Sequence, residues 1–322
     1  MSLGIAFKGP EGIVLAADSR VTLTAQVQAP GQPPMLLSST YDNATKLLRV
    51  NDQEFVGAVT YGIGAIGQSE PRTAHSYIPE FEQQLIAEGV GRLSVQDFAQ
   101  RLSDFFMAKW QAQGMPTVPN QDMIFLVGGY DEDAPYGRVF EVYVPNRPAP
   151  AEQHGGVGHF GLVWGGQREY ADRLITGYDG SLPELVQQFL NLDDAARDGL
   201  LQHLKDHLQA PVPYAFLPLQ DCVDLAIFLI RTTIVMQHWI MGVRGVGGAI
   251  DVAVITRTDG FRDIQKKNHC SAGTVSLWPS GVTPSSRCSR ARGAGLSDGP
   301  FARIPNLGRP AVACGGLQPA RR

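Results

Sequence analysis

The chain has 322 residues, of which 43% are apolar and 18% are charged, and its formal net charge is −4. This composition is ordinary for a soluble globular protein with one large core, and the small net charge indicates neither a nucleic-acid nor a membrane partner. The charge is uneven: residues 266–322 hold nine Lys or Arg and one acid, so this segment carries +8 and the rest −12.

The chain begins with a predicted pair of strands. Leu3–Lys8 alternates in hydropathy, Gly9–Gly12 has the residues of a tight turn, and Ile13–Ala17 is an apolar strand. Asp18 ends the second strand, so we expect its carboxylate beside the start of the chain.

Met1 and Ser2 precede the first strand. Methionine before a residue as small as serine is routinely removed, which would leave Ser2 with a free α-amine and its own hydroxyl. An α-amine has a reference pKa of about 7.7–8.0, so near neutral pH it can accept a proton from the hydroxyl, directly or through one water. Ser2 is therefore a candidate nucleophile, although serine at this position is also common in chains without catalysis.

A second strand pair is predicted around residue 50. Lys46 lies just before the strand signal Leu47–Val50, and Asn51-Asp52 begins a turn into Glu54–Thr60. In the following Tyr61-Gly62-Ile63-Gly64 a strand should give way to a helix and leave backbone N–H groups unpaired. This glycine pair is not a nucleotide loop, because no lysine follows in P-loop register.

Two helices are predicted next. Ser94–Gln111 is the clearer one, since Ser94 is a good N-cap, Asp97 lies three residues on, and apolar residues repeat with helical spacing. Gly67–Glu88 precedes it, with Pro71 in or near the opening turns and Pro79 in the middle. Strands are then predicted at Met123–Val127, Val139–Val144 and His159–Trp164, with a helix at Glu169–Thr176.

An apolar helix and a late strand complete the predicted core. Asp221 is expected to cap a helix over the apolar stretch Cys222–Ile240, and Gly247–Arg257 has the pattern of a core strand. Charged residues such as Asp224 and Arg231 make the apolar stretch too polar to span a bilayer. The order of strands, two helices, strands, helices and a final strand pair indicates an α+β fold rather than a doubly wound parallel sheet.

Cysteine usage and the absence of a secretory signal predict a cytoplasmic protein. The body has one cysteine, Cys222, and no metal-binding spacing of Cys and His is present. His203 and His207 lie four apart but have no third ligand nearby, so we expect a solvated helix there and no metal. The other cysteines are Cys270, Cys288 and Cys314.

Three segments, Ser2–Arg20, Lys46–Gly67 and Gly247–Gly260, resemble the catalytic β-type subunits of the proteasome family, which are N-terminal nucleophile hydrolases. With weaker similarity between them, the resemblance spans residues 2–265 and suggests a bacterial proteasome-like homologue. It implies a four-layer αββα sandwich, with two antiparallel sheets between helical layers. Residues 1–265 would form this domain, and residues 266–322 a basic, Gly-, Pro-, Ser- and Arg-rich tail that we expect to be disordered.

The resemblance also implies roles for four residues. Ser2 would attack a peptide carbonyl, Lys46 would lower the proton affinity of the nucleophile, Asp18 would pair with Lys46, and the Gly62 N–H would bind the oxyanion. No metal or cofactor is implied. Taken singly, Lys46 has an ordinary interpretation as a solvated strand-end charge, Asp18 as a turn residue and Gly62 as a helix-start or turn glycine.

The chain departs from the family at several positions. Ser2 stands where threonine is usual and lacks the methyl group that restricts χ1. Val243 and Val246 stand where the family has an aspartate and a serine, and Gly166 stands near another supporting serine. Hydrogen bonds that orient the terminal amine would therefore be missing.

These observations predict a threonine/serine-type peptidase within a homo-oligomeric ring, acting on peptides or unfolded proteins, with an ATP-dependent unfoldase as a candidate partner. The alternatives are a non-catalytic structural subunit of such a ring and a hydrolase of small amides. Two insertions, Thr22–Thr40 and Gly180–Leu219, either reshape pockets or ring contacts or are tolerated at the surface. The second insertion contains predicted helices at Leu182–Leu190 and Asp193–Leu208.

Overall fold

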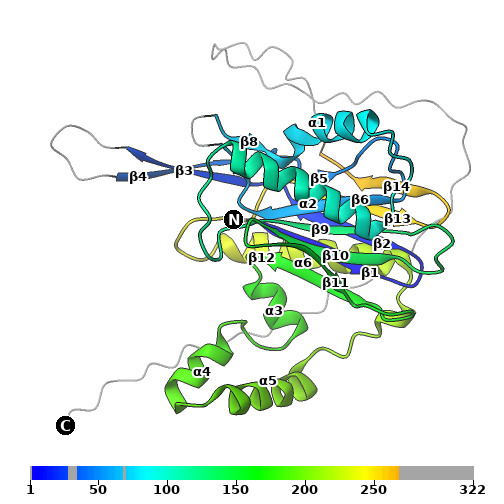
Figure 1. Cartoon of the computed structure of the whole chain (residues 1–322). Coiled ribbons are helices and arrows are strands. Elements are labelled where there is room, and N and C mark those ends of the chain that lie inside the picture. The colour runs from blue at the N-terminus through cyan, green and yellow to red at the C-terminus, as the bar shows by residue number, and fades with distance from the viewer. Residues whose placement is uncertain (1, 28–34, 68–69, 268–322) are drawn as a thin grey trace, which may run out of the picture. The chain divides into compact units, whose positions relative to one another are not determined.

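Two five-stranded antiparallel sheets form the centre of the chain (Figure 1). A computed structural model describes residues 2–27, 35–67 and 70–267. The first sheet has the order β12-β1-β2-β13-β14 and comprises β1 (Leu3–Lys8), β2 (Ile13–Asp18), β12 (Gly161–Gly166), β13 (Ile250–Thr256) and β14 (Gly260–Gln265). The second has the order β11-β10-β9-β6-β5 and comprises β5 (Leu47–Leu48), β6 (Val56–Gly62), β9 (Met123–Gly129), β10 (Arg138–Val144) and β11 (Arg147–Gln153).

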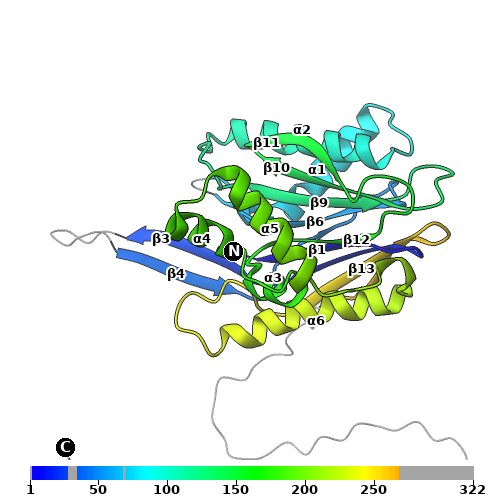
Figure 2. The same cartoon turned by 90° about the horizontal axis from the view of Figure 1, so that it is seen from below.

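Helices pack on the outer faces of the two sheets (Figures 1 and 2). Helices α1 (Ala74–Ala87) and α2 (Val95–Ala112) share a buried apolar cluster with β6, β9 and β10. Helices α3 (Glu169–Ile175) and α6 (Leu219–Gln237) share another with β1, β2 and β13. A third cluster lies between the sheets and includes Leu15 and Leu126. The α+β prediction is therefore confirmed.

The first strand pair is confirmed. Strand β1 pairs with β2 so that Gly4 lies opposite Ala17, and the turn closes through the Gly9 N–H, which donates to the Gly12 carbonyl at 2.9 Å. All residues of both strands are buried, because β1 and β2 lie in the interior of their sheet and carry side chains into two cores. Asp18 consequently lies next to the start of the chain.

The predicted helix Gly67–Glu88 is wrong at its start. Strand β8 (Arg72–Thr73) pairs with β7 (Ala65–Ile66), and the helix begins only at Ala74. A residue that precedes proline is disfavoured in the helical region, so Pro71 favours a turn before the helix rather than its opening. The second helix is confirmed, with Ser94 Oγ accepting the Asp97 N–H at 3.0 Å.

The start of α6 also differs from the prediction. The helix begins at Leu219, and Asp221 lies within its first turn instead of capping it. The Leu219 N–H donates to Glu11 Oε2 at 2.7 Å, so a side chain from the first hairpin satisfies a backbone donor that the local sequence leaves open. The helix ends at Gln237, before the exposed Trp239.

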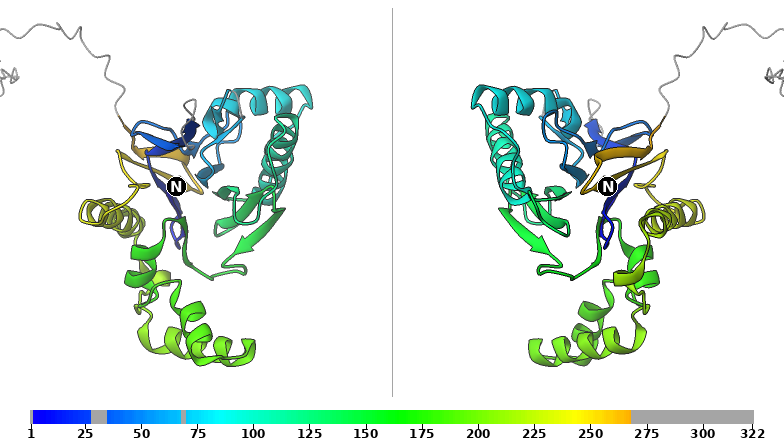
Figure 3. Two further views of the ribbon diagram at one scale, coloured as in Figure 1. Left: turned by 90° about the vertical axis from the view of Figure 1, so that its left-hand side faces the viewer. Right: turned by 90° about the vertical axis from the view of Figure 1, so that its right-hand side faces the viewer.

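Both insertions form regular structure. The first contains a hairpin of β3 (Val21–Val27) and β4 (Met35–Tyr41). The second contains α4 (Leu182–Leu190) and α5 (Asp194–Leu208), with Asp193 Oδ1 accepting the Ala196 N–H. Neither helix has a buried residue, and both project away from the sheets (Figure 3).

Of the predicted basic tail, Lys266 and Lys267 belong to the described part of the chain, and the other residues, with Cys270, Cys288 and Cys314, lie outside it. Within the ranges described, we find no helix with the length and apolarity needed to cross a bilayer.

Cys222 is fully buried on α6, where burial raises the pKa of its thiol to about 11. Because the thiolate is the reactive form, we expect Cys222 in the folded protein to react with an alkylating reagent on the order of 100-fold more slowly than an exposed thiol of ordinary pKa. Mass mapping of alkylated peptides before and after unfolding measures this. Equal alkylation of Cys222 in both states would contradict the burial.

Candidate active site

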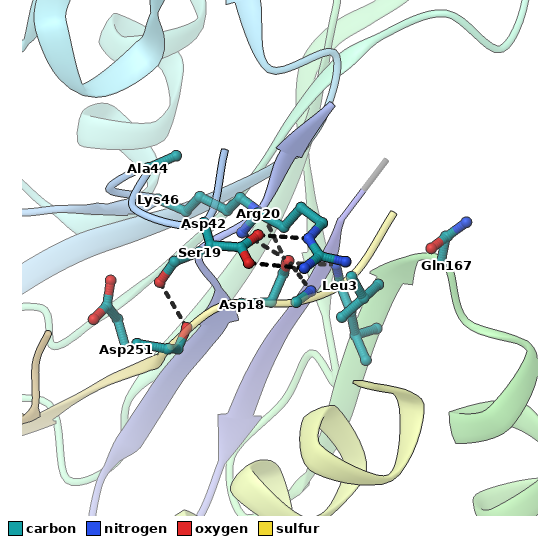
Figure 4. A network of polar contacts seen from close by, with 12 residues as sticks. Leu3, Asp18, Ser19, Arg20, Asp42, Ala44, Lys46, Gln167 and Asp251 are labelled. Carbon is teal, nitrogen blue, oxygen red and sulfur yellow. Dashed lines mark hydrogen bonds and ion pairs between the residues drawn. The ribbon is translucent and has the colours of Figure 1, made fainter. Parts of the chain in front are cut away.

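The carboxylate of Asp18 is the centre of a buried polar network at the start of the chain (Figure 4). Its Oδ1 accepts the Leu3 N–H at 3.1 Å and Lys46 Nζ at 2.7 Å. Its Oδ2 accepts the N–H groups of Arg20 at 3.1 Å and Gly247 at 3.0 Å. One carboxylate thus joins the start of β1, the segment before β5 and the loop before β13.

Lys46 and Asp18 form a buried ion pair, with side chains 5% and 0% exposed. Burial lowers the pKa of Lys46, and the negative charge of Asp18 opposes that shift. Three backbone N–H groups also donate to the Asp18 carboxylate, so the pair has the extra hydrogen bonds that a buried ion pair needs.

Ser2 lies immediately before β1 and is 4% exposed. Its carbonyl accepts the Gln167 N–H at 2.8 Å, next to the pairing of Leu3 with Gly166. A Cβ at Gly166 would lie 1.9 Å from the Ser2 carbonyl oxygen, and its φ is +98°. The glycine at this departure from the family pattern is therefore required by the close approach of Ser2.

Ser2 and Lys46 line the same small pocket, whose volume of about 10 Å³ suits at most one water molecule. Thr60 lies in its wall, and the buried Thr60 Oγ1 has no hydrogen-bond partner among the residues that the structure describes. The pocket therefore has room for a proton-relaying water but not for a substrate side chain.

A larger cleft of about 1250 Å³ adjoins this pocket. Tyr61, Ile63 and Gly64 line both spaces. Thr22 of the first insertion also faces the cleft. The other residues around it include Gly62, Asp122, Tyr143, Arg147, Gly166 and Gln167.

Gly62, the predicted oxyanion donor, is the last residue of β6 and lines the larger cleft. Strand β6 lies between β9 and β5. On the side of β9, the Ile63 N–H donates to the Asp122 carbonyl, and on the side of β5, the Thr60 N–H donates to the Lys46 carbonyl. Because N–H groups alternate in direction along a strand, the Gly62 N–H points to the same side as that of Thr60, toward the Lys46 segment. This direction suits the predicted role, although Gly62 does not line the small pocket beside Ser2.

We expect Gly62→Ala to destabilise the protein by about 1–3 kcal/mol and to slow any reaction at Ser2. Gly62 has φ of +84°, and a Cβ there would lie 2.3 Å from the Asp122 carbonyl oxygen, so the backbone would have to move. Gly64→Ala is the matched control, because its Cβ would meet only Val21 at 3.6 Å. Chemical denaturation of the two variants measures the difference, and equal stability would contradict the strained geometry.

The sequence did not identify three polar side chains around the site. Gln237 at the end of α6 bonds the Gln167 side chain at 2.6 Å. Lys267 Nζ contacts Asp251 Oδ2 at 3.0 Å and the Ala44 carbonyl at 2.5 Å, forming a second buried ion pair close to Lys46. Of these three residues, only Asp251 could have been noticed in the sequence, because a carboxylate within an apolar strand needs a polar partner.

Val243 and Val246, the two valines at which the sequence departs from the family pattern, have different surroundings. Val243 is exposed, while Val246 is buried and its N–H donates to Gln237 Oε1 at 3.0 Å. A polar group from α6 therefore reaches the position beside Val246 where the family pattern places a serine.

No protein-family model matches the chain, and no curated protein matches it. Among solved structures, it is similar to the Gly-1 mutant of Anbu from Hyphomicrobium sp. strain MC1, with 14% sequence identity and a TM-score of 0.48. The match covers 83% of this chain and 87% of that one. A likeness at this level does not define a family for the chain, so its function must be inferred from its own side chains.

Proposed function

We propose that the chain is a peptidase whose nucleophile is the hydroxyl of Ser2, exposed as the N-terminus when Met1 is removed. One observation carries this proposal: Lys46 Nζ and the Leu3 N–H meet at the same buried oxygen of Asp18, directly after Ser2. A buried cation held beside the start of a chain favours the neutral form of a terminal amine, which is the form that accepts a proton.

The reaction follows from these groups. The Ser2 amine takes the proton of Oγ, directly or through a water in the small pocket, while Oγ attacks the carbonyl carbon of the peptide bond. The Gly62 N–H donates to the oxyanion of the tetrahedral intermediate, which stabilises it by about 3–4 kcal/mol. Collapse breaks the C–N bond, and the leaving amine takes the proton from the Ser2 ammonium. Water, activated by the same amine, then hydrolyses the ester.

We further propose that the two sheets and their outer helices are a four-layer αββα sandwich of the proteasome β-type, N-terminal nucleophile hydrolase kind. The apolar clusters on both outer faces and between the sheets support this arrangement. In this proposal the chain forms a homo-oligomeric ring in the cytoplasm and degrades peptides or unfolded proteins, with an ATP-dependent unfoldase as a candidate partner.

The second candidate is a non-catalytic structural subunit of such a ring. Val243, Val246 and Gly166 favour it, because none supplies the polar side chain expected of the family at those positions. The intact Lys46–Asp18 pair favours catalysis, since a purely structural role does not require a buried cation beside Ser2.

Intact mass spectrometry separates the two candidates. The native protein, Ser2→Ala and Lys46→Ala are measured before and after treatment with an electrophile selective for N-terminal hydroxyl nucleophiles. We expect the native protein to lack Met1, which lies outside the described residues, and to gain one adduct on Ser2. Retention of Met1, or the same adducts on all three proteins, would favour the structural subunit.

A further inference from the structure

The side-chain amide of Gln237 links two backbone segments that meet at the candidate site. Gln237 is 2% exposed; its Oε1 accepts the Val246 N–H at 3.0 Å, and its Nε2 donates to Gln167 Oε1 at 2.6 Å. Because a backbone N–H can only donate, the atom facing Val246 must be the oxygen of Gln237. Its nitrogen therefore faces Gln167, whose facing atom must be the oxygen.

Both partners of Gln237 continue to the candidate site. The Gln167 N–H donates to the Ser2 carbonyl at 2.8 Å. On the other side, Val246 is followed by Gly247, whose N–H donates to Asp18 Oδ2 at 3.0 Å and whose carbonyl accepts the Ser19 N–H at 3.0 Å. A continuous path of hydrogen bonds and adjoining backbone thus runs from Ser2 through Gln237 to Asp18.

We propose that Gln237, acting through Gln167, is a positioning residue for Ser2, in place of the polar side chains that are missing at Val243 and Val246. This inference rests on the proposed function of Ser2 as the nucleophile. By holding the Gln167 and Gly247 segments at a fixed separation, the amide supports the direct contact between the Leu3 N–H and Asp18 Oδ1 and so the position of Ser2. Small displacements of a reacting group are costly, so the effect should appear in kcat more than in KM.

The test uses the full-length protein, a fluorogenic peptide and the Ser2-directed electrophile. Gln167→Met removes the side-chain acceptor but keeps the backbone donor to Ser2, and Gln237→Leu removes the whole amide. We expect each to lower kcat and the rate of adduct formation by roughly 10- to 100-fold with little change in KM. Gln237→Glu should recover most of the rate, because its carboxylate accepts the Val246 N–H and a rotated Gln167 amide.

Thr233→Val is the matched control. Thr233 is buried one turn earlier on α6, and its hydroxyl donates to the Leu229 carbonyl of the same helix, so we expect normal kcat with reduced stability. Native rates in both Gln167→Met and Gln237→Leu would overturn the inference while leaving the function of Ser2 intact. If Gln237→Leu fails to fold, Gln167→Met decides alone. A native protein without an adduct on Ser2 would overturn the proposed function and the inference together.

Discussion

Replacing Asp18 with asparagine should lower the free energy of unfolding by about 3–5 kcal/mol, the usual cost of leaving one member of a buried ion pair alone. Lys46 would lose the carboxylate whose negative charge opposes the lowering of its pKa by burial, so a buried ammonium would be left unpaired or would have to give up its proton. The Asn oxygen can face either the Leu3 N–H and Lys46, or the N–H groups of Arg20 and Gly247, so two donors must face the new NH₂ group. Urea denaturation measures the loss, and adduct formation at Ser2 should also fall.

Two further variants separate stability from chemistry. Asp251→Asn breaks the neighbouring buried pair with Lys267, whose side chains are 3% and 5% exposed, and should be similarly destabilising with a smaller loss of Ser2 reactivity. The double variant Asp18→Asn/Lys46→Met should be more stable than Asp18→Asn alone, because no charge is left unpaired. An Asp18→Asn protein as stable as the native one would show that the pair is not buried in solution.

Replacing Lys46 with methionine should slow adduct formation and peptide hydrolysis by roughly 10²- to 10⁴-fold, the range typical of acid–base assistance. Methionine keeps the apolar stem but removes the cation that, in the proposed mechanism, opposes protonation of the Ser2 amine. The amine would then stay protonated to higher pH. We therefore also expect the pH at which the reaction reaches half its maximal rate to move upward.

Measuring the rate of adduct formation over a series of pH values tests the direction of this shift. Lys8→Met is the matched control, because Lys8 is also a buried lysine, but it donates to the His154 and Gly156 carbonyls at the far end of β1. We expect the control to leave the pH profile unchanged. A Lys46→Met profile that coincides with the native one, or moves to lower pH, would remove Lys46 from the mechanism.

The first hairpin and the position of Asp18 could be predicted because both depend on local signals. Alternating hydropathy in Leu3–Lys8 and a four-residue turn suffice to bring the end of β2 back to the start of β1. The pairing of Asp18 with Lys46 is different, since 28 positions separate them and no local pattern identifies the partner. Only the resemblance to a known family proposed that pairing.

Other features depend on contacts that a single segment cannot reveal. Strand β11 was not predicted. It contains Pro148 and Pro150, which lack an N–H, and it lies at the edge of its sheet, where such residues are tolerated. The Glu11 side chain accepts a hydrogen bond from the start of α6, 208 positions away. Gln237 lies on the mostly apolar helix α6, and the sequence of that helix does not indicate which groups its amide contacts. For Glu11 and Gln237 a partner therefore comes from a remote part of the chain, whereas β11 pairs with the strand just before it.

The ion pair of Lys267 has a practical consequence for designing shortened versions of this protein. A version that stops at Gln265, the end of the last strand, would leave the Asp251 carboxylate enclosed without its cation and release the Ala44 carbonyl two positions before Lys46. Shortened versions should therefore retain Lys267, and we expect those two extra residues to decide whether the expressed protein is well folded.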